Sequence, residues 1–234
     1  MTGTQEYGED TLRVARTARV GRVGTLSAAT RETWVVLHGY GHLARSFAAS
    51  ATWPAGDTRV FLFPEALQRF YDAEPGTPHA TAPVGASWMT REARDDDIAD
   101  NHAYLDALVT HARGTAPGAR LTVLGFSQGG ATAARWAAHR ISSGHEPPRL
   151  ILWGAALPMD VDLGENAPLR RLRVEIVIGT RDRWVTPERM SAEQARLDAA
   201  KFPIALRRFE GGHRLDDVTL AELVHPHPFG PSAL

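Results

Sequence analysis

The chain has 234 residues, of which 43% are hydrophobic, and this is enough to bury the core of one domain. Its 26 basic and 27 acidic residues nearly cancel, so the chain lacks the overall positive charge that holds nucleic acid, and no nucleic-acid partner is expected. It contains no cysteine, which excludes disulfides, thiolate metal sites and a cysteine nucleophile.

The N-terminal segment gives no sign of export. Residues 1–10 are polar and slightly acidic, unlike a secretory signal, so a cytoplasmic location is expected. The longest apolar run, Leu150–Met159, is interrupted by Gly154 and Pro158 and is shorter than the roughly 20 residues that span a bilayer. We expect no transmembrane segment and a single domain over residues 1–234, with poor order at 1–10 and 225–234.

The order of apolar runs predicts a sheet. Residues 11–26 alternate small apolar side chains with arginines, which favours half-exposed strands at a sheet edge, with a basic docking arm as the alternative. From Trp34 onward, short apolar runs alternate with longer amphipathic segments, as in βα units on a parallel sheet that is covered on both faces. The expected strands are Trp34–Leu37, Arg59–Phe63, Leu121–Leu124, Leu150–Trp153, Val174–Ile178 and Ile204–Phe209.

Helices are expected between these strands. The clearest are Asp96–Ala112, Gly129–Ile141 and Pro187–Lys201. Thr186 is the expected N-cap of the last helix, whose first turn Pro187 suits. Residues 74–87 are rich in Pro, Gly, Thr and Ala and predict a long surface loop. The predicted fold class is therefore α/β, with a mostly parallel central sheet flanked by helices.

A serine lies in a glycine-rich turn directly after the strand Leu121–Leu124. The turn runs Gly125-Phe126-Ser127-Gln128-Gly129-Gly130 and leads into an alanine-rich helix. A serine nucleophile needs this strand–turn–helix arrangement, because a tight turn raises the hydroxyl above the sheet. Backbone N–H groups at the start of the helix also point to where negative charge would develop. Ser127 is thus the candidate nucleophile; an N-capping serine in a plain turn is the alternative.

A hydroxyl is a weak nucleophile, so Ser127 needs a base, and the base needs a carboxylate to orient it. Asp182 follows the strand Val174–Ile178 within a turn, and His213 follows the next strand behind a glycine pair. Either residue alone is typical of a turn or a surface. Because parallel strands end at the same edge of a sheet, the order Ser, Asp, His predicts a catalytic triad of Ser127, Asp182 and His213.

The oxyanion of such a site needs a second donor from the loop after an early strand. Trp34–Leu37 leads into His38-Gly39-Tyr40-Gly41. We expect the backbone N–H groups of Tyr40 and Gln128 to form the oxyanion hole. His38 is expected to brace this loop, and a role for it as the catalytic base is the disfavoured alternative.

Together these segments resemble the phospholipase/carboxylesterase family of α/β-hydrolases, which includes acyl-protein thioesterases and small bacterial carboxylesterases. The resemblance spans roughly residues 34–223 and rests on the His38–Gly41 and Gly125–Gly130 motifs, Gly179 with Asp182 and Pro187, and Gly212-His213. It implies the α/β-hydrolase fold without a large cap domain. We expect a monomer or homodimer that uses no cofactor and no metal. It also implies hydrolysis of small-molecule carboxyl esters or thioesters with short-to-medium acyl chains.

The resemblance also implies a substrate contact. Ser87-Trp88 matches a tryptophan position of the family, so Trp88 would line the acyl groove, with an ordinary buried aromatic as the alternative. The chain departs from the family at Met89–Glu92 and at Pro64–Ala66, which leaves the substrate open.

Other functions stay open as well. The same triad serves peptides, lactones or lysophospholipids in other enzymes, and a hydrolase fold also serves as a non-catalytic binding protein. A metal hydrolase is less favoured, because the chain has no H-E-x-x-H motif and Asp95–Asp97 suits the positive end of a helix.

Overall fold

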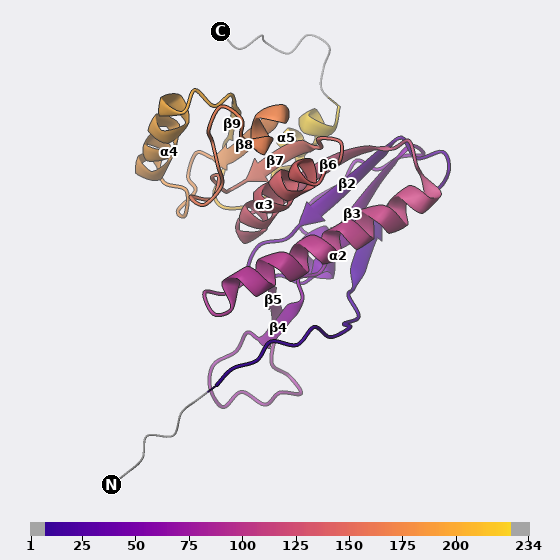
Figure 1. Ribbon diagram of the computed structural model, residues 1–234. Helices are drawn as coiled ribbons and strands as arrows, with labels where there is room; N and C mark the ends of the chain where they lie inside the picture. The colour runs from indigo at the N-terminus through magenta and orange to yellow at the C-terminus, as the bar shows by residue number, and fades with distance from the viewer. Residues whose placement is uncertain (1–7, 226–234) are drawn as a thin grey trace.

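The computed structural model describes residues 8–225 (Figure 1). Its main feature is a seven-stranded sheet in the order β1-β3-β2-β6-β7-β8-β9, in which β1 is antiparallel to β3 and every other neighbouring pair is parallel. The strands of this sheet are β1 (Val20–Val23), β2 (Glu32–Leu37), β3 (Arg59–Pro64), β6 (Arg120–Phe126), β7 (Arg149–Trp153), β8 (Val174–Gly179) and β9 (Ala205–Phe209).

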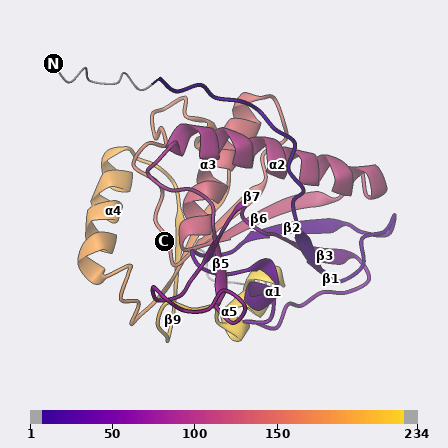
Figure 2. The same ribbon diagram turned by 90° about the horizontal axis from the view of Figure 1, so that it is seen from below.

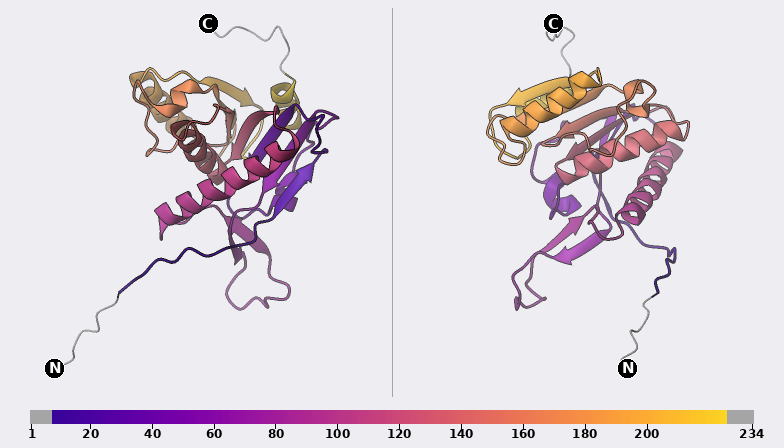
Figure 3. Two further views of the ribbon diagram at one scale, coloured as in Figure 1. Left: turned by 45° about the vertical axis from the view of Figure 1, so that its right-hand side comes forward. Right: turned by 60° about the vertical axis from the view of Figure 1, so that its left-hand side comes forward.

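A separate antiparallel hairpin pairs β4 (Gln68–Tyr71) with β5 (Val84–Ser87) and projects away from the large sheet (Figure 3). The helices are α1 (Ala44–Ala48), α2 (Arg94–Thr115), α3 (Gln128–Ser142), the 3-10 helix η1 (Pro168–Arg171), α4 (Pro187–Ala199) and α5 (Asp217–Val224). Within residues 8–225, no large cap domain covers the sheet. No helix of that range is both long and apolar enough to cross a bilayer.

The sheet is apolar on both faces because helices cover both (Figure 2). In β2, Val35 and Leu37 join a core shared with α2, α3 and α4, whereas Trp34 and Val36 join a second core shared with α1 and α5. Side chains alternate between the faces of a strand, so an uninterrupted apolar run supplies both cores. This is the reason that the short apolar runs predict the central strands correctly.

The structure confirms the six strands expected from residue 34 onward, with shifts of one or two residues at their ends. It also confirms the three expected helices, as α2, α3 and α4. Thr186 caps α4 through a hydrogen bond from the backbone N–H of Arg189 to its hydroxyl. The prediction of a loop over residues 74–87 is wrong at its end, since Val84–Ser87 forms β5 by pairing with Gln68–Tyr71.

The N-terminal prediction is also only partly correct. Val20–Val23 forms the expected edge strand, but residues 8–19 have no regular secondary structure, and Leu12 and Val14 are 83% and 82% exposed. The physical reason is that β1 pairs with β3 only as far as Val20 and Pro64, so the preceding residues have no strand to pair with. The expected poor order at the two ends falls largely on residues 1–7 and 226–234, which lie outside the described residues.

Close packing at one edge of the sheet gives a stability prediction. A Cβ added at Gly129 in α3 would lie 2.5 Å from the carbonyl oxygen of His38 and 2.6 Å from that of Leu37. Gly129→Ala must push the helix and β2 apart and should lower the free energy of unfolding by about 3 kcal/mol. Gly114 in α2 meets nothing within 4 Å, so Gly114→Ala should instead raise it by about 0.5–1 kcal/mol. Urea unfolding measures both, and equal effects would contradict the packing argument.

Candidate active site

Four segments that follow parallel strands meet at one edge of the large sheet. The register pairs Leu37 of β2 with Gly125 of β6, Phe126 with Trp153 of β7, and Gly179 of β8 with Phe209 of β9. The turns that follow these strands therefore emerge side by side. They carry the predicted site residues Ser127, Asp182 and His213, together with the loop of Tyr40.

Ser127 lies in a strained turn between β6 and α3. Its backbone has φ 53° and ψ −119°, a conformation that residues other than glycine seldom adopt. The Ser127 N–H donates to the carbonyl of Trp153 at 2.9 Å, which ties this turn to the end of β7. The local geometry is thus that of the sharp strand-to-helix turn predicted from the sequence.

Asp182 and His213 form a direct pair. His213 Nδ1 lies 2.7 Å from Asp182 Oδ2, and the Asp182 side chain is only 1% exposed. The other carboxylate oxygen, Oδ1, accepts the backbone N–H groups of Trp184 at 2.8 Å and Val185 at 3.0 Å. Both oxygens are therefore held, which fixes the carboxylate in the orientation that faces the imidazole.

Trp153 and Gly154, at the end of β7, lie between Ser127 and the Asp182–His213 pair: Trp153 accepts the Ser127 N–H, and Gly154 packs against His213. A Cβ added at Gly154, where φ is 59°, would lie 2.9 Å from Cε1 of His213 and 3.5 Å from Oδ2 of Asp182. The ring of Phe126, next to Ser127, is centred 4.8 Å from the His213 ring. In the described part of the chain, no hydrogen bond joins the Ser127 hydroxyl to His213, and Nε2 of His213 has no hydrogen-bond partner there.

The loop of Tyr40 lies beside Ser127. A Cβ added at Gly39 would be 3.3 Å from Cβ of Ser127. The backbone N–H groups of Tyr40 and Gln128 have no hydrogen-bond partner within residues 8–225, whereas the neighbouring Gly41 N–H donates to Ala86. Both predicted oxyanion donors are thus unengaged, on chain segments that adjoin the nucleophile candidate.

His38 has a structural position. Its Nε2 accepts the N–H of Ala66 at 3.0 Å, so the ring hydrogen is on Nδ1, which donates to the carbonyl of Gly39 at 2.8 Å. The ring is buried against Trp88, and burial lowers the pKa of His38 to about 4. With both nitrogens bonded to backbone, His38 braces the loop and is not placed to act as a base.

The expectation that Trp88 lines the acyl groove is not met in this structure. The side chain of Trp88 is 0% exposed, and its indole N–H donates to the carbonyl of His38 at 2.8 Å. The ring is held in the core because it fills space between His38 and the α2 side of the sheet, where Asn101 also binds its backbone carbonyl at 2.6 Å. Among the residues that neighbour the predicted site residues in sequence, Tyr40 and Trp184 are instead the exposed aromatics, at 59% and 55%.

Some contributors to the site escaped the sequence analysis. The backbone donors at residues 184 and 185 could have been found, because an aspartate in a turn commonly accepts N–H groups two and three residues later. The contacts of the Gln128 side-chain amide and the close approach of Gly154 to His213 depend on distant segments and leave no local signal.

The triplet Asp95–Asp97 lies in the first turn of α2, and Asp97 accepts the N–H of Thr90 at 3.1 Å.

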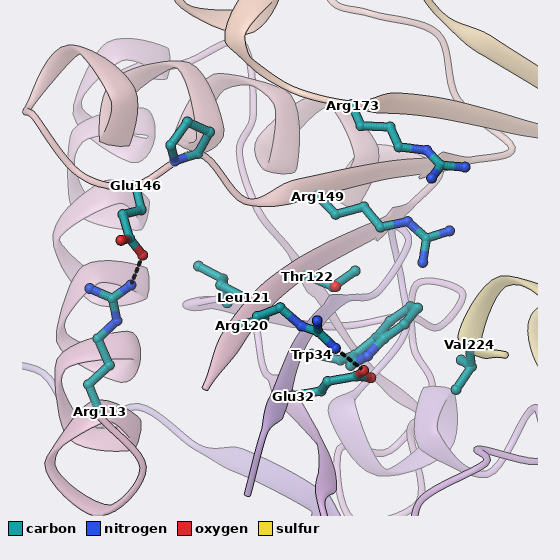
Figure 4. A pocket seen from close by; sticks show the side chains of 11 residues that line it. Glu32, Trp34, Arg113, Arg120, Leu121, Thr122, Glu146, Arg149, Arg173 and Val224 are labelled. Carbon is teal, nitrogen blue, oxygen red and sulfur yellow. Dashed lines mark hydrogen bonds and ion pairs between the residues drawn. The ribbon is translucent and has the colours of Figure 1, made fainter. Parts of the chain in front are cut away.

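A pocket of about 440 Å³ lies at the opposite edge of the sheet, where the parallel strands begin (Figure 4). Its charged groups pair with one another: Arg120 lies 2.9 Å from Glu32, and Arg149 lies 2.8 Å from the buried Glu175. No serine or histidine of the described chain lines it. These ion pairs lie where the strands begin, whereas Ser127, Asp182 and His213 lie at the other edge.

The buried His38 predicts a pH effect on stability. Because the unfolded chain binds a proton near pH 6.5 and the folded chain only near pH 4, the stabilisation is complete above pH 6.5 and is lost as the pH falls to about 4. His38→Gln keeps an acceptor for Ala66 and a donor for Gly39 but removes the titrating group. The slope of the unfolding free energy against pH should therefore fall by about 1.4 kcal/mol per pH unit in this range. Urea unfolding between pH 7 and 4 tests this, with His145→Gln at the surface as the control, and an unchanged slope would contradict it.

Comparisons with known proteins bear on the fold. No family model and no curated protein sequence matches the chain. Among solved structures, it is similar to acyl-protein thioesterase 2 of Zea mays (TM-score 0.65, 18% identity, covering 89% of this chain and 97% of that one). It is also similar to a Bacillus cereus carboxylesterase (TM-score 0.58, 14% identity, covering 89% of this chain and 92% of that one). A phospholipase/carboxylesterase of Dyadobacter fermentans is similar as well (TM-score 0.57, 15% identity, covering 92% of this chain and 97% of that one). At such low identities the likeness establishes the architecture: this chain has the α/β-hydrolase fold.

Proposed function

We propose that this protein is a serine hydrolase that cleaves carboxyl esters or thioesters of short-to-medium acyl chains. The observation that carries the proposal is the 2.7 Å contact between His213 and the buried Asp182, at the same sheet edge as Ser127. The similar solved structures support this class of substrate, since their names describe a thioesterase and carboxylesterases.

In the proposed reaction, Ser127 Oγ attacks the carbonyl carbon of the substrate while Nε2 of His213 takes the hydroxyl proton. Asp182 accepts the Nδ1–H and stabilises the imidazolium that forms. Collapse of the tetrahedral intermediate breaks the bond to the alcohol or thiol, which receives the proton from His213. Water then attacks the acyl-enzyme by the same route and releases the acid. The Ser127–His213 hydrogen bond forms in the complex with substrate, as it does in many enzymes whose free form has a longer contact.

The developing oxyanion is proposed to bind the backbone N–H groups of Tyr40 and Gln128. Each such donor contributes about 3 kcal/mol to transition-state stabilisation in comparable enzymes. With Trp88 in the core, the exposed rings of Tyr40 and Trp184 offer the apolar surface for an acyl chain near the site. A chain-length series of p-nitrophenyl esters and matched thioesters, compared with peptide, lactone and lysophospholipid substrates, decides the acyl class.

Replacing the nucleophile tests the proposal directly. Ser127→Ala should lower kcat by about 10⁴-fold or more, because no other group can form the acyl-enzyme. It should also remove labelling by a fluorophosphonate, which in the wild-type protein we expect intact-mass and peptide analysis to locate at Ser127. Ser142→Ala, at the exposed end of α3, is the matched control. Labelling that persists in Ser127→Ala would refute the assignment.

The two oxygens of Asp182 give a second test. In Asp182→Asn, the backbone N–H groups of Trp184 and Val185 require the single remaining oxygen, so the amide NH₂ faces His213 Nδ1. That forces the ring proton onto Nε2, the nitrogen that must accept the serine proton, and kcat should fall by about 10³–10⁴-fold. The exposed Asp198→Asn on α4 serves as control for the chemical change. Loss of less than tenfold would show that Asp182 does not orient the base.

A further inference from the structure

The two proposed oxyanion donors belong to different parts of the chain. Tyr40 lies in the loop after β2, whereas Gln128 is the first residue of α3. An oxyanion hole stabilises charge only when its donors are fixed relative to each other before the reaction, to within about 0.5 Å. Residues 86–89, which we call the bridging segment, join these two parts of the chain.

The bridging segment is bound to the Tyr40 loop on one side. The carbonyl of Ala86 accepts the N–H of Gly41 at 2.9 Å, and the indole N–H of Trp88 donates to the carbonyl of His38 at 2.8 Å. The approach is very close, because a Cβ added at Gly85 would lie 2.7 Å from the carbonyl oxygen of Gly41. His38 and Gly41, which lie on either side of Tyr40 in the chain, are thus both hydrogen-bonded to this segment.

The side chain of Gln128 binds the same segment from the other side. Its Oε1 accepts the N–H of Trp88 at 3.0 Å, and its Nε2 donates to Ser87 Oγ at 3.0 Å and to the carbonyl of Met89 at 2.9 Å. One acceptor and two donors use the amide in a single orientation. A residue that offers its backbone N–H to the site therefore holds, with its side chain, the segment that positions the other donor.

The bridging segment is also anchored by contacts that do not involve Gln128. Trp88 is fully buried, and Asn101 on α2 holds its carbonyl at 2.6 Å. The three hydrogen bonds of the Gln128 amide are additional to this anchoring. They fix the distance between the bridging segment and the start of α3, which is the distance that sets the spacing of the two donors.

We propose that the side chain of Gln128 is a positioning residue that holds the Tyr40 N–H at its working distance from the Gln128 N–H through Ser87, Trp88 and Met89. This inference rests on the proposed function and goes beyond it. It assigns to the glutamine of the Gly125–Gly130 turn a role for its side chain that is separate from that of its backbone.

Gln128→Met tests the inference, because methionine keeps the backbone N–H and the side-chain length but removes all three hydrogen bonds. We expect kcat to fall about 10-fold, less than the 10²–10³-fold loss of a whole donor, with KM changed less than twofold. Affinity for a trifluoromethyl ketone, which forms a tetrahedral anion on Ser127, should fall in parallel, whereas binding of an uncharged, unreactive amide analogue should not. A merely structural role would weaken both ligands alike, and that result would overturn the proposal.

Ser87→Ala is the milder companion variant, since it removes one of the three partners and should lower kcat about threefold. Combined with Gln128→Met it should add nothing further, because the shared link is already lost. Gln194→Met, at an exposed hydrogen bond to Asp198, is the matched control. If the wild-type protein is not labelled by the fluorophosphonate, the proposed function fails and this inference with it. If it is labelled and Gln128→Met retains full kcat, the inference alone is rejected.

Discussion

The structure depends on burying the carboxylate of Asp182 against an imidazole. A carboxylate whose side chain is 1% exposed is tolerated only when its oxygens accept hydrogen bonds. Here one oxygen contacts His213, and the other accepts two backbone N–H groups. These partners come from the turns after β8 and β9, so the pair exists only while the two strands keep their register. The geometry of the candidate site therefore depends on the register of β8 and β9, in which Gly179 pairs with Phe209.

The same register explains why much of the site was predictable from the sequence. The central strands are buried on both faces, so they are nearly uniform apolar runs, and the polar residues that follow them are conspicuous. Parallel strands place those residues at a common edge, which is how Ser127, Asp182 and His213 were selected although distant in the chain. The strained backbone of Ser127 was also foreseeable, because glycines surround it and a helix begins directly after it.

The remaining features depend on contacts that no local pattern records. Residues 11–19 alternate as a strand would, yet β3 offers no partner beyond Pro64, so the alternation alone does not make a strand. The loop prediction missed β5 because pairing with β4 overrides the composition of residues 84–87. Trp88 was assigned to a groove because its position matched a family pattern, but burial is set by what surrounds the ring. These errors share one cause: each depends on a neighbour remote in sequence.

The opposite edges of the sheet differ in how their polar groups are paired. Where the strands begin, arginines and glutamates such as Arg120 and Glu32 form ion pairs, and no serine or histidine of the described residues lines the pocket there. Where they end, the backbone N–H groups of Tyr40 and Gln128 and the Nε2 of His213 are left without partners in the described chain. Unsatisfied polar groups cost free energy, so their concentration at one edge needs rigid support from other hydrogen bonds. The fully bonded amide of Gln128, next to an unengaged N–H of the same residue, supplies that support at the point where it is needed.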